Sequence, residues 1–157
     1  MTDKLMDLQI TNYKFGEKPT VTRPDPEFLK VMGEQGIRDM VSKFYDTVRQ
    51  SSIKHLFKED ETEFQQSKLH SSDFMIQILG GPEYYNQHRG QPKMANRHAP
   101  FSITPEGRIV WLSSYREILL QLDAPEHLIE SFWNYLNVFS NWMVNTDPEK
   151  PVFKITK

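Results

Sequence analysis

The chain has 157 residues, and its 19 basic and 21 acidic side chains give a formal net charge of −2. This near balance argues against a dedicated nucleic-acid-binding protein, which usually carries a strong positive field. The sequence contains no run of about 18 apolar residues, so it predicts no membrane span. The absence of cysteine excludes disulfides and thiolate metal ligands. It fits a cytoplasmic protein, as does a first segment that lacks the apolar centre of a signal peptide.

The length suits one domain with one core. Residues 1–24 are polar and irregular, with scattered glycine and proline, and indicate an extension that lies outside the core. Residues 147–157 have the same character and indicate a tail. We therefore expect a single folded domain at residues 25–146.

The first two helical patterns differ in their inward faces. Residues 37–48 repeat apolar side chains at spacings of three and four, and Tyr45 borders that stripe. Residues 60–79 form a second helix whose inward face carries Ser67 and Ser71 where a plain core would have leucine or isoleucine. Two interpretations stay open: the serines bond back to their own helix, or they line a cavity that holds something small and polar.

The stretch "GGPEYYNQHRGQPKMANRHAPF", residues 80–101, concentrates glycine, proline, histidine and cations. Pro100 disfavours a helical conformation at Ala99, so we expect a short helix that begins around Pro92 and ends at or near His98. Free carbonyls at that end can accept a hydrogen bond from one imidazole nitrogen, which leaves the other as a lone pair for a metal. The alternative is a histidine bonded into a loop or favoured by the helix dipole.

Two longer helices follow. Thr104 and Pro105 predict the start of a helix that carries Trp111 on the flank of its apolar stripe. Pro125, after Asp123 and Ala124, predicts the start of the last helix, whose apolar stripe runs Ile129, Phe132, Trp133, Leu136, Phe139 and Met143. No segment alternates as a strand would, so the sequence predicts an all-α fold.

These patterns together describe a mainly apolar pocket with one candidate ligand, His98, and several hydrogen-bond donors from Tyr45, Trp111 and the two serines. A bound haem with a diatomic ligand needs such a composition. The remaining histidines are weaker candidates. We expect His70 to point off the pocket, and we expect His55, His88 and His127 to lie at surface, turn or capping positions.

The string "LGGPEYYNQHRGQPKMANRHAPFSI" followed by "VWL", with "VSKFYDTV" upstream and "MVN" near the end, resembles the group II truncated haemoglobins. The resemblance covers about residues 27–145, with its main gaps between Tyr45 and Ser67. It implies a 2-over-2 globin fold, in which two antiparallel helix pairs stack around a haem. Glycines permit this compression in the family, and here Gly33 and Gly80–Gly81 match them.

The resemblance also implies roles for individual residues. His98 resembles the proximal haem ligand, and the distal donors would be Tyr45, Trp111, Ser67 and Ser71. Phe57 matches an aromatic packed on the haem, and Phe101 lies in the matching R-H-x-P-F motif; Arg97 and Lys93 or Tyr85 would approach the propionates. The chain departs from the family at Gln91, Met94 and Ala95, and the lost cation at Ala95 weakens the expected propionate anchoring.

The resemblance implies a protein that holds haem b non-covalently and binds O₂, or NO or CO, at its iron. The implied role is oxygen binding, transport or storage, by a monomer or a weak homodimer. An alternative on the same scaffold is a redox enzyme, a NO dioxygenase or peroxidase, that would need an external reductase. A third is a haem-free helical interaction domain of globin shape.

Overall fold

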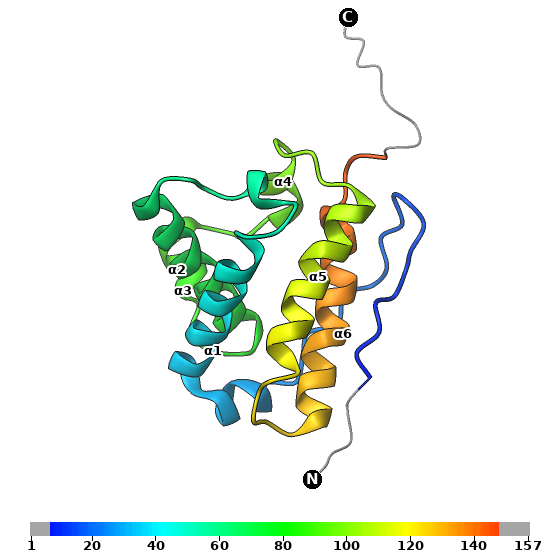
Figure 1. The fold of residues 1–157 in the computed structure, drawn as a ribbon. Coiled ribbons are helices and arrows are strands. Elements are labelled where there is room, and N and C mark those ends of the chain that lie inside the picture. Colours follow the sequence, from blue (N-terminus) through cyan, green and yellow to red (C-terminus); the bar gives the residue numbers. More distant parts are fainter. Residues whose placement is uncertain (1–6, 148–157) are drawn as a thin grey trace, which may run out of the picture.

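The computed structural model describes residues 7–147, and within that range the chain is all-helical, as predicted. The helices are α1 (Glu27–Val48), the short 3₁₀ helix η1 (Lys54–Leu56), α2 (Glu61–Ile78), α3 (Tyr84–Arg89), α4 (Met94–His98), α5 (Pro105–Leu119) and α6 (Glu126–Met143). Helix α1 packs on α2, and α5 packs on α6, while α1 also contacts both α5 and α6. The result is the expected 2-over-2 stack of two helix pairs (Figure 1). Among residues 7–147, no helix is both long and apolar enough to cross a membrane.

Side-chain caps begin two of the long helices: α5, where Thr104 was predicted as the cap, and α2, where the cap was not predicted. The Asp60 carboxylate accepts a hydrogen bond from the Glu63 backbone N–H at 3.0 Å, which satisfies a free donor at the start of α2. The Thr104 hydroxyl does the same for the Gly107 N–H at 3.0 Å, and proline fills the first turn of α5. Helix α6 begins after Pro125 with no side-chain cap.

Glycine bends the chain where the fold turns most sharply. Gly33 interrupts α1 with φ 75° and ψ 162°, a conformation that only glycine adopts readily. Gly80 ends α2 at φ 93°. Next to it, a Cβ at Gly81 would lie only 2.7 Å from Ile76 Cγ2 of α2 and 2.8 Å from Leu29 Cδ2 of α1, so the missing side chain lets the two helices approach closely there. The glycine positions that the resemblance implied are thus the ones the fold needs.

The N-terminal segment corrects the expectation that it lies outside the core. Leu8 is 3% exposed and belongs to the core cluster. Residues 7–25, which we call the N-terminal strap, run beside α6 in Figure 1. Its backbone is held by side chains of the domain: the indole N–H of Trp133 donates to the Gln9 carbonyl at 2.8 Å, and that of Trp142 donates to the Pro19 carbonyl at 2.7 Å. The division of the chain at residues 24 and 146 stays a prediction, and the tail beyond Asp147 lies outside the described residues.

The strap is fastened most firmly by Arg108 of α5. This side chain is buried and donates to the Thr11 carbonyl at 2.8 Å, the Asn137 carbonyl at 2.7 Å and the Ser140 hydroxyl at 2.9 Å. Burial lowers the pKa of its guanidinium, and its nearest aromatic neighbour in the strap is Tyr13, whose ring centroid lies 5.5 Å away. One cation therefore ties the strap to both helices of the α5/α6 pair.

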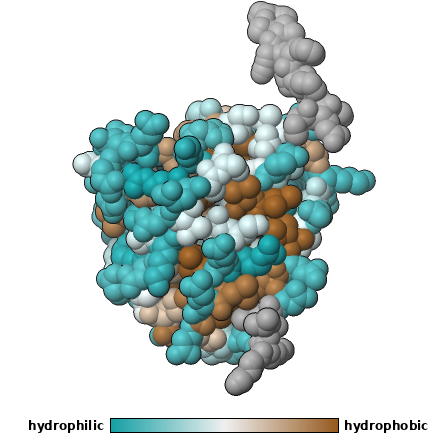
Figure 2. Space-filling model, viewed as in Figure 1, coloured by the Kyte–Doolittle hydropathy of each residue, from teal (hydrophilic) through white to brown (hydrophobic). Residues whose placement is uncertain are grey.

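The surface in the orientation of Figure 1 is mostly hydrophilic over α1 and α2, and more apolar along the region of α5 (Figure 2). Ile109 on α5 and Leu120, which directly follows this helix, are 41% and 47% exposed.

Candidate functional site

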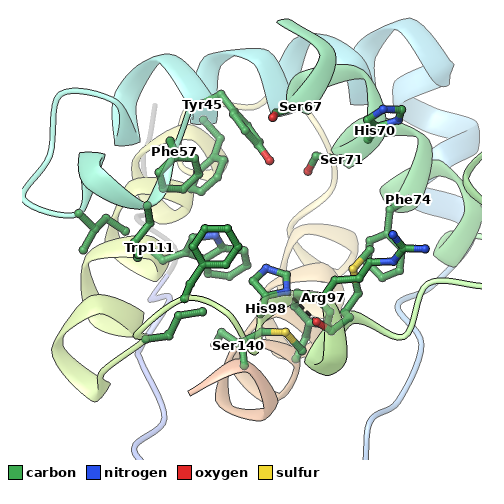
Figure 3. Close-up of a pocket in the computed structure, with 18 of the residues that line it drawn as sticks. Tyr45, Phe57, Ser67, His70, Ser71, Phe74, Arg97, His98, Trp111 and Ser140 are labelled. Carbon is green, nitrogen blue, oxygen red and sulfur yellow. Dashed lines mark hydrogen bonds between the residues drawn. The ribbon is translucent and has the colours of Figure 1, made fainter. Parts of the chain in front are cut away.

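A cavity of about 320 Å³ lies between the two helix pairs. Residues from all six α-helices and from η1 line it, and Figure 3 shows side chains converging on it from both pairs. Its size falls in the range of ligand pockets, and its walls are mostly apolar, with a few polar groups.

His98 occupies the last position of α4, at the end of the short helix as expected, although that helix begins at Met94 rather than around Pro92. Its Nδ1 lies 2.7 Å from the Met94 carbonyl oxygen. Since a carbonyl can only accept, Nδ1 must carry the proton, and Nε2 is left with a lone pair. The ring lines the cavity (Figure 3). The geometry thus supplies one oriented imidazole ligand.

The loop that follows His98 is fixed by Asn145, just after α6. Its side-chain amide donates to the Phe101 carbonyl at 2.8 Å, and its oxygen accepts from the Ile103 N–H at 2.9 Å. Helix α6 therefore holds the segment that carries the imidazole.

Tyr45 of α1 and Ser67 and Ser71 of α2 face His98 across the cavity (Figure 3). Burial raises the pKa of the Tyr45 phenol above its usual 10.0, a hydrogen bond with Ser71 lowers it, and the nearby Tyr85 raises it, with a net upward shift. The phenol therefore keeps its proton at neutral pH and can donate a hydrogen bond. Of the two interpretations left open for the serines, lining a cavity is the one that matches their position.

Aromatic side chains form the rest of the wall. Trp111 of α5 meets Phe44 edge to face, with ring centroids 5.5 Å apart. Phe57, which follows η1, meets Tyr45 in the same way at 5.5 Å. Tyr85 is buried and lines the cavity, whereas Phe101 lines it while 42% exposed. All four residues line the cavity, and the haem contacts that the resemblance implies for them stay predictions.

The two cations expected near the propionates differ. Arg97 lines the cavity, but its guanidinium donates to three backbone carbonyls, of Pro92 at 2.6 Å, Arg89 at 2.8 Å and Gln91 at 3.0 Å. It therefore shapes the loop before α4. Lys93 is exposed, has φ 40°, and does not belong to the cavity lining. Arg89, which the sequence reasoning left out, does line the cavity.

His70 corrects another expectation, because it lines the cavity instead of pointing away from it. Figure 3 places it beside Ser71 at the edge of the site. Its Nδ1 is buried without a hydrogen-bond partner among the described residues. Burial lowers its pKa, Arg89 lowers it further and Asp73 raises it. The helical spacing alone placed this residue off the inward face, and the breadth of the cavity brings it in.

Sequence reasoning also missed Tyr115, four residues after Trp111 on α5. It lines the cavity, is fully buried, and its hydroxyl has no hydrogen-bond partner among the described residues. The i to i+4 spacing from Trp111 was the signal that could have found it, since such pairs share one helix face.

The residues present fit a haem. The buried Nδ1 of His70 and the hydroxyl of Tyr115 are polar atoms that lack a partner within residues 7–147. Such atoms are rare in folded proteins unless a ligand or water satisfies them. Together with an apolar cavity and one imidazole lone pair directed by the Met94 carbonyl, they match what a tetrapyrrole with a proximal histidine requires.

Comparisons with known proteins agree with this geometry. The profile of the bacterial-like globin family matches residues 28–145. The group 2 truncated hemoglobin YjbI of Bacillus subtilis (strain 168) is 30% identical over 117 residues, which cover 74% of this chain and 86% of that protein.

Solved structures give the same result for the fold. Phosphate-bound Hell's gate globin IV superposes with a TM-score of 0.81 at 29% identity, covering 87% of this chain and 86% of that one. The truncated oxygen-avid haemoglobin of Bacillus subtilis superposes with a TM-score of 0.67 at 29% identity, covering 75% of this chain and 98% of that one. The chain belongs to the bacterial-like globins and, within them, to the group II truncated haemoglobins.

Proposed function

We propose that the chain holds haem b non-covalently through His98 Nε2 and binds O₂, or another diatomic ligand such as NO or CO, on the side of the cavity that Tyr45 faces. The observation that carries the proposal is the hydrogen bond from His98 Nδ1 to the Met94 carbonyl at 2.7 Å, because it directs a lone pair into an apolar cavity opposite a neutral phenol. Haem iron held in this way supplies one open coordination position for a small ligand.

The distal side chains would act by donating hydrogen bonds. The Tyr45 hydroxyl and the Trp111 indole N–H are the main donors, and Ser67 and Ser71 assist directly or through water. These donors are preset in a low-dielectric pocket, so they stabilise negative charge on a bound ligand without reorganising. A polarised ligand such as O₂ gains more from them than CO does.

The other walls would position the cofactor. Phe57, Tyr85 and Phe101 line the cavity and would pack against the haem, and Arg97, which shapes the loop before α4, would lie near its carboxylates. Since Lys93 is exposed outside the cavity lining, its expected role at the propionates has no support from its position.

Oxygen binding is the function that these features support best, and a structural neighbour is described as an oxygen-avid haemoglobin. We keep as parts of the proposal a cytoplasmic location and a monomer or weak homodimer. A NO dioxygenase or peroxidase would use the same site with an external reductase.

The test is the absorption spectrum of the purified chain in its ferric, ferrous and CO-bound forms. Retained haem with a Soret band that shifts on reduction and on CO binding supports the proposal. A chain that folds, is offered haem and shows no Soret band contradicts it. Multiple turnovers of NO or peroxide with an added reductase would replace oxygen binding with the redox alternative.

A further inference from the structure

The side chain of Tyr115 is held rigidly at the inner wall of the cavity. Its ring stacks face to face on Phe44, with centroids 3.9 Å apart and planes 13° apart, and it meets the edge of Trp111 at 5.0 Å. Phe132 of α6 lies on a further side at 6.1 Å. Because the ring is enclosed on several sides, the hydroxyl cannot swing out to reach water.

That hydroxyl is an exception among the buried polar groups of α5 and its neighbours. The Ser114 hydroxyl donates to the Val110 carbonyl at 2.9 Å, and the Ser140 hydroxyl accepts from Arg108 at 2.9 Å. The Tyr115 oxygen has no such partner among residues 7–147. A buried hydroxyl without a partner is costly, and phenylalanine would provide the same stacking without the cost.

The phenol is also fixed in its neutral form. Burial raises its pKa well above the usual value, and the neighbouring phenols Tyr45 and Tyr135 raise it further. The oxygen therefore carries a proton and has a hydrogen bond to donate. The protein supplies no acceptor within the described residues, and the cavity that Tyr115 lines is an adjoining space from which one can come.

We propose that the Tyr115 hydroxyl forms a second binding position in the cavity, where it donates a hydrogen bond to a small neutral acceptor. The acceptor is an ordered water molecule or an unattached diatomic ligand, two sources of the same chemistry. A charged acceptor is disfavoured because aromatic rings surround the position and would strip its hydration. The position is distinct from that of Tyr45, which lies on α1 and faces Ser71 of α2.

A position of this kind would hold a ligand or water next to Trp111, the proposed distal donor, because the two side chains are in ring contact. A ligand that leaves the main site would find an acceptor-binding group there before it reaches solvent. The diatomic part of this inference rests on the proposed function, whereas the water part does not.

The test uses the full chain and the variant Tyr115→Phe, which keeps the ring and removes only the hydroxyl. The matched control is Tyr135→Phe, because Tyr135 is also a buried phenol, on α6, but does not line the cavity. High-resolution crystal structures of the parent and of both variants would show whether an ordered water lies near the side chain at position 115 or 135. Infrared spectra of the CO complex, photolysed at cryogenic temperature, report the surroundings of the trapped CO.

The proposal expects a water oxygen, or trapped CO, within hydrogen-bond distance of the Tyr115 oxygen. Tyr115→Phe should then lose that water or shift the band of trapped CO, and Tyr135→Phe should do neither. The proposal is overturned if no acceptor lies near the Tyr115 oxygen and the trapped-CO band is the same in Tyr115→Phe as in the parent. If the chain retains no haem, the proposed function fails, and the crystal structure of the haem-free protein still decides the water site.

Discussion

Replacing Trp111 with phenylalanine isolates the contribution of one indole N–H to ligand retention. Phenylalanine can keep the edge contacts with Phe44 and Tyr115, whose centroids lie 5.5 Å and 5.0 Å from the indole, so the wall of the cavity persists. What disappears is the indole N–H, which we propose as a donor to the bound ligand.

The magnitude follows from the apolar surroundings of that donor. A hydrogen bond to a polarised or charged group contributes about 1.5–3 kcal/mol. If the bond is broken in the transition state for escape, its loss should speed O₂ dissociation roughly ten- to hundredfold. CO is less polarised, and its dissociation should change less than that of O₂.

The assay is O₂ displacement by excess CO in a stopped-flow instrument, with CO dissociation measured by displacement with NO. Trp142→Phe is the control, because its indole N–H donates to the Pro19 carbonyl of the strap and it does not line the cavity. An O₂ dissociation rate in Trp111→Phe equal to that of the parent and of Trp142→Phe would refute the reasoning and remove Trp111 from the distal donors.

Three further changes test the fold and the rim of the site. Gly33→Ala should lower the free energy of unfolding by about 1–3 kcal/mol. The backbone at φ 75° and ψ 162° strains any residue with a side chain, although nothing lies within 4 Å of the added Cβ. Urea unfolding measures this change in stability, and an unchanged midpoint would contradict the strain argument. Arg108→Met should lower the free energy of unfolding by about 1–2 kcal/mol, since it removes the donor to the Thr11 carbonyl while relieving a buried charge. It should also speed proteolysis within the strap, and equal cleavage rates would show that Arg108 does not fasten it. In the haem-free protein His70 has a lowered pKa, so its stabilising contribution is present above its ordinary pKa of 6.5 and is lost as the pH falls through the lower, folded value. His70→Gln should therefore reduce the loss of stability between about pH 7.5 and about pH 5.5, and identical losses in parent and variant would exclude this histidine as the cause.

The parts of the fold that could be predicted are those set by local rules. Helical spacing placed residues 37–48 and the α6 stripe, and cap chemistry placed the start of α5 at Thr104. The short helix does end at His98, as predicted, but the reason given was wrong, because Ala99 before Pro100 keeps helical dihedrals of φ −55° and ψ −35°. In each case the signal lies within a few residues of the feature.

The strap could not be predicted, because its contacts join residues more than a hundred positions apart. Its backbone carbonyls accept hydrogen bonds from Trp133, Trp142 and Arg108. Because every residue has a backbone carbonyl, the residue types of the strap do not indicate which carbonyls accept. The six-residue α3 escaped notice because it is shorter than any periodic pattern can reveal.

The site was predictable where the resemblance supplied positions and uncertain where it did not. Tyr45, Trp111, Ser67 and Ser71 all line the cavity with His98. His70 and Tyr115 were misplaced or missed because the cavity reaches beyond the inward stripe of α2 and one turn further along α5. Only the packing of the two helix pairs fixes how wide that cavity is.

The central claim is that one imidazole nitrogen, Nε2 of His98, holds the iron. The measurement that tests it most directly is the haem content and absorption spectrum of His98→Gly, with and without added imidazole, beside His88→Gly as a control outside the cavity lining. The account predicts that His98→Gly loses haem or shows altered ligation, that free imidazole restores the parent spectrum, and that His88→Gly keeps it. A His98→Gly protein with the parent's haem content and an unchanged spectrum without imidazole would contradict the account.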